Sequence, residues 1–329
     1  MAIIGAGSWG TALSLILTNR GHEVRLWAHE PEVVESIRER RENELFLPGV
    51  CLPAGIAPTQ DLEEALERSE IVLTVVPSHV CRDIYKRMLP HLHPGQVFVS
   101  ATKGLEIQRR LRMSEVIAQV LGAKFASRLA VLSGPSFARE VARGDPTAVV
   151  VASESRETAR MVQENFASGS LRLYTTTDLA GVELGGAVKN VIAIAAGIIE
   201  GLGLGHNPTA ALVTRGLAEI TRLAYACGGR RETLAGLAGM GDLVLTCTGD
   251  LSRNRSVGVA LGRGYRLDQI LASMRTVAEG IKTAEATVGL AQDRGVEMPI
   301  TEQIHRILEG GITPREAIRQ LMERSLKDE

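Results

Sequence analysis

The sequence has few aromatic residues and almost no net charge. Aromatic side chains make up 3% of the 329 residues, which argues against the stacking platforms that bind single-stranded nucleic acid. The 37 Lys and Arg residues nearly balance the 38 Asp and Glu residues, so no broad field attracts DNA or a membrane surface. We therefore expect no nucleic-acid partner, and any anionic ligand must be bound by a local site.

Cysteine and long hydrophobic runs are also scarce. The most apolar run, Val191–Ile199, is far shorter than the roughly 18–20 residues of a membrane span. No positively charged leader precedes the first apolar residues, so we expect no signal peptide and a soluble protein. The scattered cysteines show no C-x-x-C pair or metal-ligand spacing, which is typical of reduced thiols in a cytoplasmic protein, and we expect no metal. They are Cys51, Cys81, Cys227 and Cys247.

The length and the sequence pattern predict two domains. A chain of 329 residues exceeds the roughly 250–300 residues at which a single hydrophobic core stops growing. In the first part, short β-rich runs alternate with amphipathic helical patterns, which is typical of a parallel sheet with crossover helices. Runs such as IVLTVV and TAVVVA are apolar throughout, as strands covered on both faces are. The predicted strands are Ala2–Ile4, Glu23–Ala28, Ile71–Val76, Val97–Ala101, Leu129–Leu132, Thr147–Ala152 and Leu171–Thr175.

The second part of the chain reads as helical. Residues 209–229 combine an apolar and a polar face at helical spacing, and Gly228 and Gly229 are placed to end that helix. The apolar face is Leu212, Val213, Leu217, Ile220, Leu223 and Ala224, and the polar face is Arg215, Glu219 and Arg222. The predicted fold class is therefore α/β. A Rossmann-type, doubly wound, mostly parallel sheet occupies residues 1–178, and an all-helical C-terminal domain occupies residues 179–329.

The first loop carries a clear chemical motif. IIGAGSWGTA places glycines at Gly5, Gly7 and Gly10, a G-x-G-x-x-G pattern directly after a predicted strand and at the start of a helix. Gly5 would allow the tight turn, Gly7 the approach of a pyrophosphate, and Gly10 the packing of helix on strand. The phosphates would lie at the helix N-terminus, where free N–H groups and the helix dipole favour anions. At the head of an alternating α/β domain, the pattern predicts a dinucleotide site rather than a purely structural turn.

The end of the second predicted strand bears on which dinucleotide binds. Sites specific for NAD usually place Asp or Glu there, where the carboxylate binds the ribose 2′-hydroxyl and repels a 2′-phosphate. This chain has Ala28 and His29 at that point, so nothing there excludes NADP. A one-residue shift of the strand end would bring Glu30 to the ribose instead. We expect NADPH to be used at least as well as NADH, with NADH still accepted.

Two further stretches follow predicted strands and should face a ligand cleft. Lys103 in FVSATKGLE comes directly after a strand, and open α/β sheets bind ligands at the carboxyl ends of their strands. A solvated loop lysine is the alternative. Gly134, Ser136 and Ala138 in VLSGPSFARE offer small, backbone-exposing surfaces, unless they only form a loop turn.

Lys189 and Asn190 interrupt a helical run of small apolar residues in GVELGGAVKNVIAIAAGIIEGLG. A lysine flanked by Val188 and Val191 loses hydration, and its pKa can fall toward neutrality. A general base for a hydroxyl proton needs such a pKa. The alternative is a surface lysine on a half-buried helix.

The stretch GMGDLVLTCTGDLSRNRSVG combines an acid with a polar cluster. Asp242 and Thr246 lie one turn apart if the stretch is helical. Ser252–Arg255 (SRNR) gathers hydroxyl, guanidinium and amide donors that suit an oxyanion, and arginine can bind phosphate through two hydrogen bonds. A solvated polar loop is the alternative.

An ordered set of motifs resembles the bacterial NAD(P)-dependent glycerol-3-phosphate dehydrogenases over essentially the whole chain: GAGSWGTA, ATKGLE, SGPSFA, GAVKNVIAIAAG, GDLVLTC, SRNR and VAEGIKTA. That family reversibly reduces dihydroxyacetone phosphate to sn-glycerol 3-phosphate, the backbone precursor of phospholipids. The resemblance implies a small phosphorylated substrate, NADP or NAD as cofactor, and a homodimer. The family often has Thr where Ser136 stands, and the hydroxyl is retained.

The resemblance also implies roles for individual positions. Lys189 matches the family's proton acceptor, and Asp242 with Asn190 would hold it in place. The predicted catalytic group is Lys189, Lys103, Asp242, Asn190 and Thr246. The predicted substrate-binding residues are Lys103, Gly134, Ser136, Lys189, Asp242, Ser252, Arg253 and Asn254. The predicted cofactor-binding residues are Gly5, Gly7, Ser8, Trp9, Gly10, His29, Lys103, Ala138, Arg253, Val277 and Glu279.

Two other functions are compatible with the same sequence motifs. A related two-domain dehydrogenase acting on a β-hydroxyacid also pairs a Rossmann domain with a helical domain and a catalytic lysine, and SRNR could bind its carboxylate. A redox sensor would bind NADPH without turnover, although the presence of Lys103, Lys189 and Asp242 together speaks against it. Activity with dihydroxyacetone phosphate but not with a hydroxyacid excludes the first function, and turnover of NADPH excludes the second.

Overall fold

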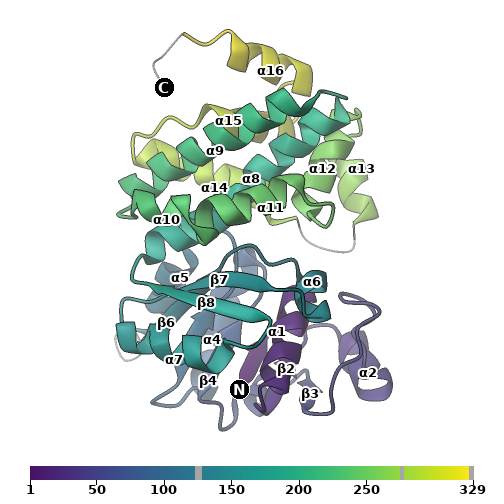
Figure 1. Cartoon of the computed structure of the whole chain (residues 1–329), viewed down its shortest axis with the longest axis vertical. Helices are drawn as coiled ribbons and strands as arrows, with labels where there is room; N and C mark the ends of the chain where they lie inside the picture. The colour runs from purple at the N-terminus through teal and green to yellow at the C-terminus, as the bar shows by residue number, and fades with distance from the viewer. Residues whose placement is uncertain (123–127, 275–277, 326–329) are drawn as a thin grey trace.

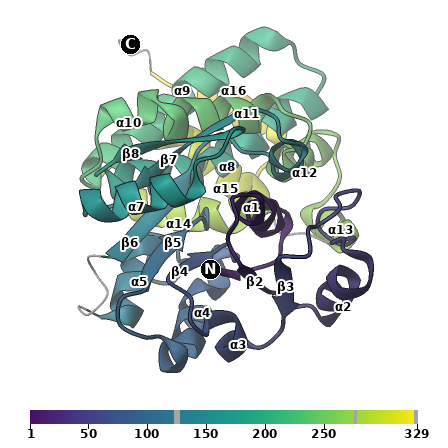
Figure 2. The same cartoon turned by 60° about the horizontal axis from the view of Figure 1, so that its bottom comes forward.

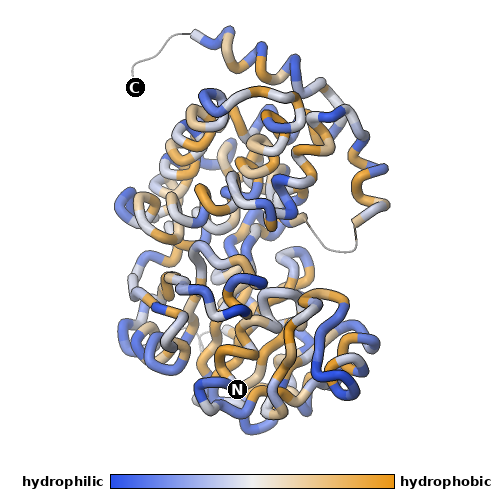
Figure 3. Tube along the Cα trace, turned by 45° about the vertical axis from the view of Figure 1, so that its right-hand side comes forward, coloured by the Kyte–Doolittle hydropathy of each residue, from blue (hydrophilic) through white to orange (hydrophobic). Residues whose placement is uncertain are grey.

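The structure, a computed structural model, describes residues 1–122, 128–274 and 278–325. Its two halves lie end to end along the long axis of the molecule, with a sheet and its helices in one and the remaining helices in the other (Figure 1). Strand β8 ends at Thr176 and helix α8 begins at Leu179, so the predicted boundary at residue 178 falls in this short connection. Figure 3 shows hydrophobic residues concentrated on the inner segments of both halves.

An eight-stranded sheet with the order β3-β2-β1-β4-β5-β6-β7-β8 forms the core of the first half. Every neighbouring pair is parallel except β6 and β7, which are antiparallel. The predicted mostly parallel sheet is thus confirmed. The strands are β1 (Ala2–Ile4), β2 (Val24–Trp27), β3 (Ile56–Thr59), β4 (Ile71–Thr74), β5 (Val97–Ser100), β6 (Leu129–Ser133), β7 (Thr147–Ala152) and β8 (Leu171–Thr176).

One strand, β3, is not among those that the sequence pattern predicts. Its sequence, IAPT, contains Pro58, which argues against a strand because proline cannot donate to the ladder. β3 lies at the edge of the sheet, where proline is tolerated, and Pro58 stands opposite Leu26 of β2.

Helices cover both faces of the sheet, as Figure 2 shows from below. Successive strand residues point to opposite faces. Ile3 belongs to the core cluster that contains side chains of α1, α2, α6 and α7, whereas Ile4 belongs to the cluster that contains side chains of α3, α4 and α5. Burial on both faces explains the apolar runs seen in the sequence. The helices are α1 (Ser8–Asn19), α2 (Pro31–Arg40), α3 (Leu62–Leu66), η1 (Ser78–Val80), α4 (Cys81–Met88), η2 (Leu89–His91), α5 (Met113–Leu121), α6 (Ala138–Arg143) and α7 (Arg156–Phe166).

Helix α8 (Leu179–Gly201) is the central helix of the second half. By length and composition alone, α8 could cross a membrane. The run Val191–Ile199 is too short to indicate this, because the helix extends well beyond it. However, the apolar window of α8 is completely buried inside the protein. It is therefore a core helix here. The elements around it are α9 (His206–Ala226), α10 (Arg231–Ala235), the π-helix η4 (Leu237–Gly241), α11 (Asp242–Thr248), α12 (Arg253–Gly262), α13 (Leu267–Ser273), α14 (Glu279–Asp293), α15 (Pro299–Leu308) and α16 (Pro314–Met322).

Helices α8 and α12 approach each other through glycines. A Cβ atom at Gly197 of α8 would lie 2.0 Å from the Arg255 carbonyl oxygen, and one at Gly258 of α12 would lie 2.0 Å from the Ile194 carbonyl oxygen. A side chain at either position would force the two helices apart. This close approach lies toward the C-terminal end of α8, and Asn254 at the start of α12 donates to Asn190, the neighbour of Lys189 on α8.

The structure corrects one expectation for α9. Glu219, predicted on its polar face, is only 2% exposed. The carboxylate accepts hydrogen bonds from the backbone N–H groups of Ile300 (2.7 Å) and Thr301 (3.2 Å) at the start of α15. It therefore satisfies N–H groups that the helix itself leaves free. Burial raises the pKa of Glu219 to about 6.

Two carboxylates of the helical half bind the sheet half. Glu183 of α8 accepts hydrogen bonds from the backbone N (2.7 Å) and Oγ (2.6 Å) of Ser114 and from Nη1 of Arg112 (3.1 Å). Glu279 at the start of α14 accepts from the backbone N (3.2 Å) and Oγ (2.6 Å) of Ser78. These contacts fix the orientation of the two halves and of the cleft between them.

Candidate active site

A cleft of about 900 Å³ lies where the two halves meet. Residues of the first loop, the ends of β2 and β5 and helix α4 line it from the sheet half, and residues of α8, α11 and the start of α12 line it from the helical half. The cleft brings together most of the residues selected from the sequence: Gly5, Gly7, Ser8, Trp9, His29, Lys103, Ser136, Ala138, Lys189, Asn190, Thr246, Ser252, Arg253, Asn254 and Glu279. Gly10, Gly134 and Asp242 are not in the lining, and Val277 lies outside the described residues.

The glycines of the first loop have the geometry that their spacing predicts. Gly5 has a φ of +118°, and a Cβ there would lie 2.4 Å from the Val75 carbonyl oxygen. A Cβ at Gly10 would lie 1.9 Å from the Gly5 carbonyl oxygen, so α1 can pack on the turn only without a side chain at this position. A Cβ at Gly7 would meet nothing within 4 Å, which leaves space above the backbone for a ligand.

The start of α1 fits an anionic dinucleotide. No side chain caps the helix at Gly7, so its first N–H groups and its dipole are available to phosphate. The residue Trp9 lines the cleft, and its Nε1 atom is buried and has no hydrogen-bond partner among the described residues. The Ser8 hydroxyl, by contrast, already donates to the Phe46 carbonyl oxygen at 2.6 Å.

Asn43, which is not among the predicted site residues, joins the loop after α2 to the glycine turn. Its Nδ2 donates to the Ala6 carbonyl oxygen and to Thr11 Oγ1, both at 2.8 Å, and its Oδ1 accepts from the Phe46 backbone N at 3.0 Å. Phe46 and Pro48 of this loop line the cleft. An amide with both donor and acceptor is required for this arrangement, but the sequence alone gives no spacing that identifies it.

Both His29 and Glu30 line the end of the cleft beyond β2. Ala28 has no exposed surface, so it points into the core rather than toward a ribose. An acid introduced at position 28 would therefore be buried in the core and away from a ribose in the cleft. The structure keeps both sequence alternatives for the ribose contact, His29 and Glu30, within the site.

Three charged residues from distant segments meet at the other end of the cleft. Asp242 of α11 accepts hydrogen bonds from the ammonium groups of Lys189 on α8 and of Lys103 after β5, the latter at 2.9 Å. Lys189 Nζ also donates to Thr246 Oγ1 at 2.9 Å. Asp242 is 1% exposed, so the two lysines lie between it and the cleft. One carboxylate thus orients two cations that face the ligand space.

Burial controls the protonation of Lys189. Loss of hydration lowers the pKa of Lys189 to about 7, and the positive charge of Lys103 acts in the same direction, whereas Asp242 opposes the shift. A lysine near pKa 7 can both give and take a proton at neutral pH. The expected depression of the Lys189 pKa is therefore present, and its surface-lysine alternative is excluded because the residue is buried.

Gly134 does not line the cleft, but its backbone carbonyl binds Lys103 of this cluster. Its carbonyl oxygen accepts hydrogen bonds from Lys103 Nζ at 3.0 Å and from Ser136 Oγ at 2.9 Å. Its φ is +141°, and a Cβ at this position would lie only 2.9 Å from the Val149 Cα, so no other residue fits here without strain. Gly134 therefore positions Lys103, while Ser136 and Ala138 face the cleft.

The SRNR stretch forms the N-terminus of α12 rather than a solvated loop. Ser252 caps the helix by accepting from the Arg255 backbone N at 3.3 Å. Arg253, the first residue of the helix, is exposed at the cleft. A helix N-terminus with an accessible guanidinium is suited to a phosphate group.

Asn190 does not hold Lys189, contrary to the expectation from the sequence. Its Oδ1 accepts instead from Asn254 Nδ2 at 3.0 Å, and Asn254 Oδ1 accepts from the Gly280 backbone N at 2.9 Å. The pair joins α8, α12 and α14 at the edge of the cleft. The hydrogen bonds of Lys189 go to Asp242 and Thr246.

Comparisons with known proteins point in one direction. Residues 1–159 match a family model described as NAD-dependent glycerol-3-phosphate dehydrogenase N-terminus, and residues 178–319 match its C-terminal counterpart. A glycerol-3-phosphate dehydrogenase (NAD(P)+) of Koribacter versatilis is 60% identical, over 98% of this chain and 97% of that protein. This chain belongs to the NAD(P)-dependent glycerol-3-phosphate dehydrogenase family.

Further members support the assignment. A glycerol-3-phosphate dehydrogenase (NAD(P)+) of Geobacter sulfurreducens is 54% identical, over 100% of this chain and 98% of that protein. The crystal structure of a glycerol-3-phosphate dehydrogenase from Coxiella burnetii superposes with a TM-score of 0.94 at 42% identity, covering 98% of each chain. The Rossmann-type sheet followed by a helical domain is thus confirmed. In the part of the chain that the structure describes, no group of three or more His, Cys, Asp and Glu side chains could hold a metal ion.

Proposed function

We infer that this chain interconverts dihydroxyacetone phosphate and sn-glycerol 3-phosphate with NADPH or NADH, which supplies glycerol 3-phosphate for phospholipid synthesis. The observation that carries this inference is the contact of Lys103 and Lys189 with Asp242 at one end of a cleft whose other end is a glycine-rich dinucleotide loop. A reaction that moves a hydride and a proton needs both parts within reach of one substrate.

The cofactor would be held by the sheet half. Gly5, Gly7 and the start of α1 would bind the pyrophosphate, and Trp9 Nε1 would find there the acceptor that it lacks among the described residues. When bound, the nicotinamide supplies or takes up the hydride at the substrate carbon that carries the oxygen. Ala138 of the sheet half and Glu279 of the helical half also line the cleft.

Lys189 would move the proton. In reduction, its ammonium group donates a proton to the substrate carbonyl oxygen as that oxygen becomes a hydroxyl, and solvent then restores the proton. In oxidation, the neutral amine takes the hydroxyl proton. Asp242 and Thr246 keep Nζ in place, and Lys103 adds a positive charge that favours the developing alkoxide.

The start of α12 would bind the substrate phosphate. Arg253 can offer two parallel hydrogen bonds, and the N-terminus of the helix offers its dipole. The contact of α8 with α12 through Gly197 and Gly258 keeps this phosphate site at a fixed place relative to Lys189. Binding energy from the phosphate could then position the reacting carbon.

The direct test is to follow NADPH absorbance after adding dihydroxyacetone phosphate to the purified protein. We expect rapid oxidation with this substrate. With unphosphorylated dihydroxyacetone, kcat/KM should be lower by more than about tenfold, because a hydrogen bond to a charged group contributes roughly 1.5–3 kcal/mol. Equal activity on both would contradict the phosphate site at α12.

The same assay separates the rival functions. Oxidation of NADPH by a β-keto acid but not by dihydroxyacetone phosphate would favour the β-hydroxyacid dehydrogenase. Cofactor binding without any turnover would favour a redox sensor.

We also propose that the protein is a cytoplasmic homodimer. Its cysteines are free thiols, which suits a reducing compartment, and sedimentation should give about twice the chain mass of 35.3 kDa.

A further inference from the structure

Arg87 places a positive charge in the cleft lining, beside the end of β2. Three residues of α4 line the cleft, namely Asp83, Ile84 and Arg87. Asp83 and Ile84 stand four and three positions before Arg87, so all three lie on one face of the helix. None of the three belongs to a motif that the sequence pattern singles out. Arg87 also lines a second, shallower hollow of about 540 Å³ beside the cleft, so it stands on the ridge between the two.

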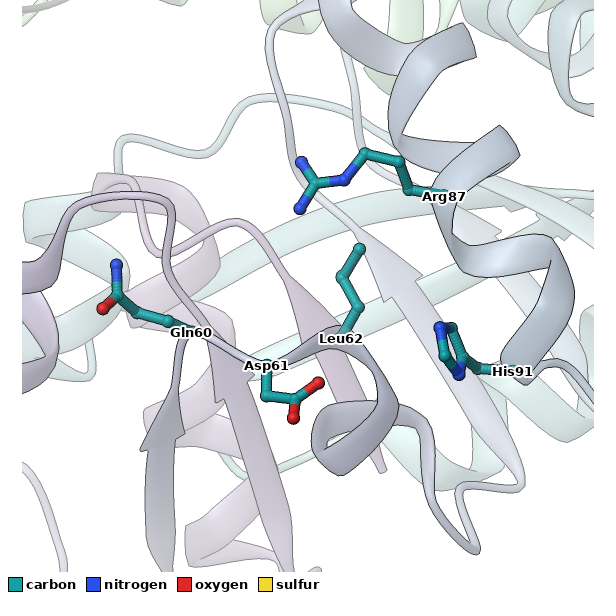
Figure 4. Close-up of a pocket in the computed structure, with 5 residues that line it drawn as sticks. All are labelled: Gln60, Asp61, Leu62, Arg87 and His91. Atoms are coloured by element: carbon teal, nitrogen blue, oxygen red, sulfur yellow. The ribbon is translucent and has the colours of Figure 1, made fainter.

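A chain of contacts links Arg87 to the end of β2. Its guanidinium carbon lies 5.7 Å from the ring centroid of Trp27, the last residue of that strand. Trp27 Nε1 donates to the Gln60 carbonyl oxygen at 2.8 Å, and Gln60 Nε2 donates to the His29 carbonyl oxygen at 3.1 Å. Figure 4 shows Arg87 reaching from α4 over Leu62, on the side that carries Gln60. The end of this strand is where a Rossmann domain binds the adenosine ribose.

The charges around this point are unevenly paired. Asp83 forms an exposed ion pair with Lys86 at 3.5 Å. Among the described residues, no carboxylate forms an ion pair with Arg87 and no donor forms a hydrogen bond with the side-chain carboxylate of Glu30. Arg87 is exposed and Glu30 is partly exposed at the cleft. The ribose end of the cleft therefore has one unpaired cation and one unpaired anion on opposite elements, α4 and the start of α2.

We propose that Arg87 binds the 2′-phosphate of NADP(H), and that Glu30 accepts a hydrogen bond from the ribose 2′-hydroxyl of NAD(H). A guanidinium binds a phosphate through two hydrogen bonds, whereas a carboxylate favours the hydroxyl and repels the phosphate. Together the two residues set the ratio of affinities for the two cofactors. This inference rests on the proposed dehydrogenase function, because it requires a dinucleotide in the cleft.

The experiment measures dissociation constants of NADPH and NADH by calorimetry, without substrate, for the wild type and three variants. Arg87→Gln should weaken NADPH binding about ten- to a hundredfold, the range for a lost hydrogen bond to a charged group, and change NADH binding less than about twofold. Glu30→Gln should tighten NADPH and weaken NADH. Lys86→Gln, the matched control, removes the same charge from the next position of α4, which is not in the cleft lining, and should change neither constant by more than about twofold.

Three outcomes would overturn the proposal. They are an Arg87→Gln variant that keeps its NADPH affinity, one that loses both cofactors equally, and a Lys86→Gln variant that reproduces the NADPH effect through charge alone. Arg87→Lys keeps the charge but not the planar pair of donors, so it should fall between wild type and Arg87→Gln. If the wild type bound neither cofactor, the dehydrogenase function itself would fail, which is a different result from a wild type that binds both without using Arg87.

Discussion

The two ends of the cleft are built in opposite ways. The glycine loop at the cofactor end uses backbone from one continuous segment, in which Gly5, Gly7 and the start of α1 follow each other directly. The catalytic end uses side chains from three segments, with Asp242 lying 53 positions from Lys189 and 139 positions from Lys103. Local sequence therefore decides the first site, whereas the second depends on how the two halves pack.

This difference predicts how each end responds to mutation. Changes in the glycine loop should alter cofactor affinity or local stability, because they act on backbone space. Changes in the lysine cluster should alter rate and its pH dependence, because they act on a proton. Single substitutions can test that division, and the largest effect is expected at Lys189.

Replacing Lys189 with Met should lower kcat by about 10²–10⁴, the range for a lost acid–base group, and leave NADPH affinity nearly unchanged. Met keeps the length and apolar stem of the side chain but has no proton to give. Steady-state kinetics and a calorimetric NADPH titration on the same preparation check both parts. If kcat stayed at the wild-type value, Lys189 would have no part in the chemistry and Lys103 would become the candidate.

The pH dependence of the two directions should be opposite. Reduction needs the Lys189 ammonium, so its kcat should fall about tenfold per unit as pH rises above the Lys189 pKa of about 7. Oxidation needs the neutral amine, so its kcat should rise with pH below about 7 and level off above it. Any residual rate of Lys189→Met should lack this step, and wild-type profiles that run in the same direction would argue against a shared acid–base group.

Two glycines of the first loop should behave differently. Gly10→Ala should lower the free energy of unfolding by about 1–3 kcal/mol, because the new Cβ meets the Gly5 carbonyl oxygen and the backbone must shift. Gly7→Ala should change stability by less than about 0.5 kcal/mol, since its Cβ enters open space. It should still weaken NADPH binding, because that space is where the pyrophosphate would lie. Denaturant unfolding and calorimetry distinguish the two, and equal losses of stability would remove the contrast.

The same division explains what the sequence could predict. The strand-to-helix position of Gly5 and Gly10 was predicted well because each requirement lies within one turn of chain. The burial of Glu219 was not, because the helix start that it caps lies 81 positions away. Asn190 was wrongly assigned to Lys189 for a similar reason, since its partner Asn254 comes from α12. β3 was not predicted because it contains Pro58, which is tolerated only in an edge strand, and the sequence does not show which strand lies at the edge of the sheet.

Arg253→Lys should raise KM for dihydroxyacetone phosphate by about tenfold, with a smaller change in kcat. Lys keeps the positive charge at the start of α12 but cannot form the planar two-bond contact, which is equivalent to losing one hydrogen bond to a charged group. Some weakening of cofactor binding is also expected, because Arg253 lies in the shared lining of the cleft. Unchanged KM values for both dihydroxyacetone phosphate and the cofactor would mean that the SRNR stretch only forms the start of α12 and does not bind a ligand.

The smallest effect tests a single hydrogen bond within the lysine cluster. Thr246 Oγ1 accepts from Lys189 Nζ at 2.9 Å and donates to the Asp242 carbonyl oxygen at 2.6 Å. Thr246→Val keeps the shape of the side chain but removes the acceptor, which should cost the ammonium form about 0.5–1.5 kcal/mol. The pKa of Lys189 should then fall by roughly 0.4–1 unit, since one unit corresponds to about 1.4 kcal/mol. The midpoint of both pH profiles should move to lower pH by that amount, and reduction at pH 7 should slow by about two- to fivefold. Thr246→Ser keeps the hydroxyl and should restore the wild-type midpoint. A Thr246→Val variant with reduced kcat but an unmoved midpoint would mean that the hydroxyl supports packing and not the protonation of Lys189.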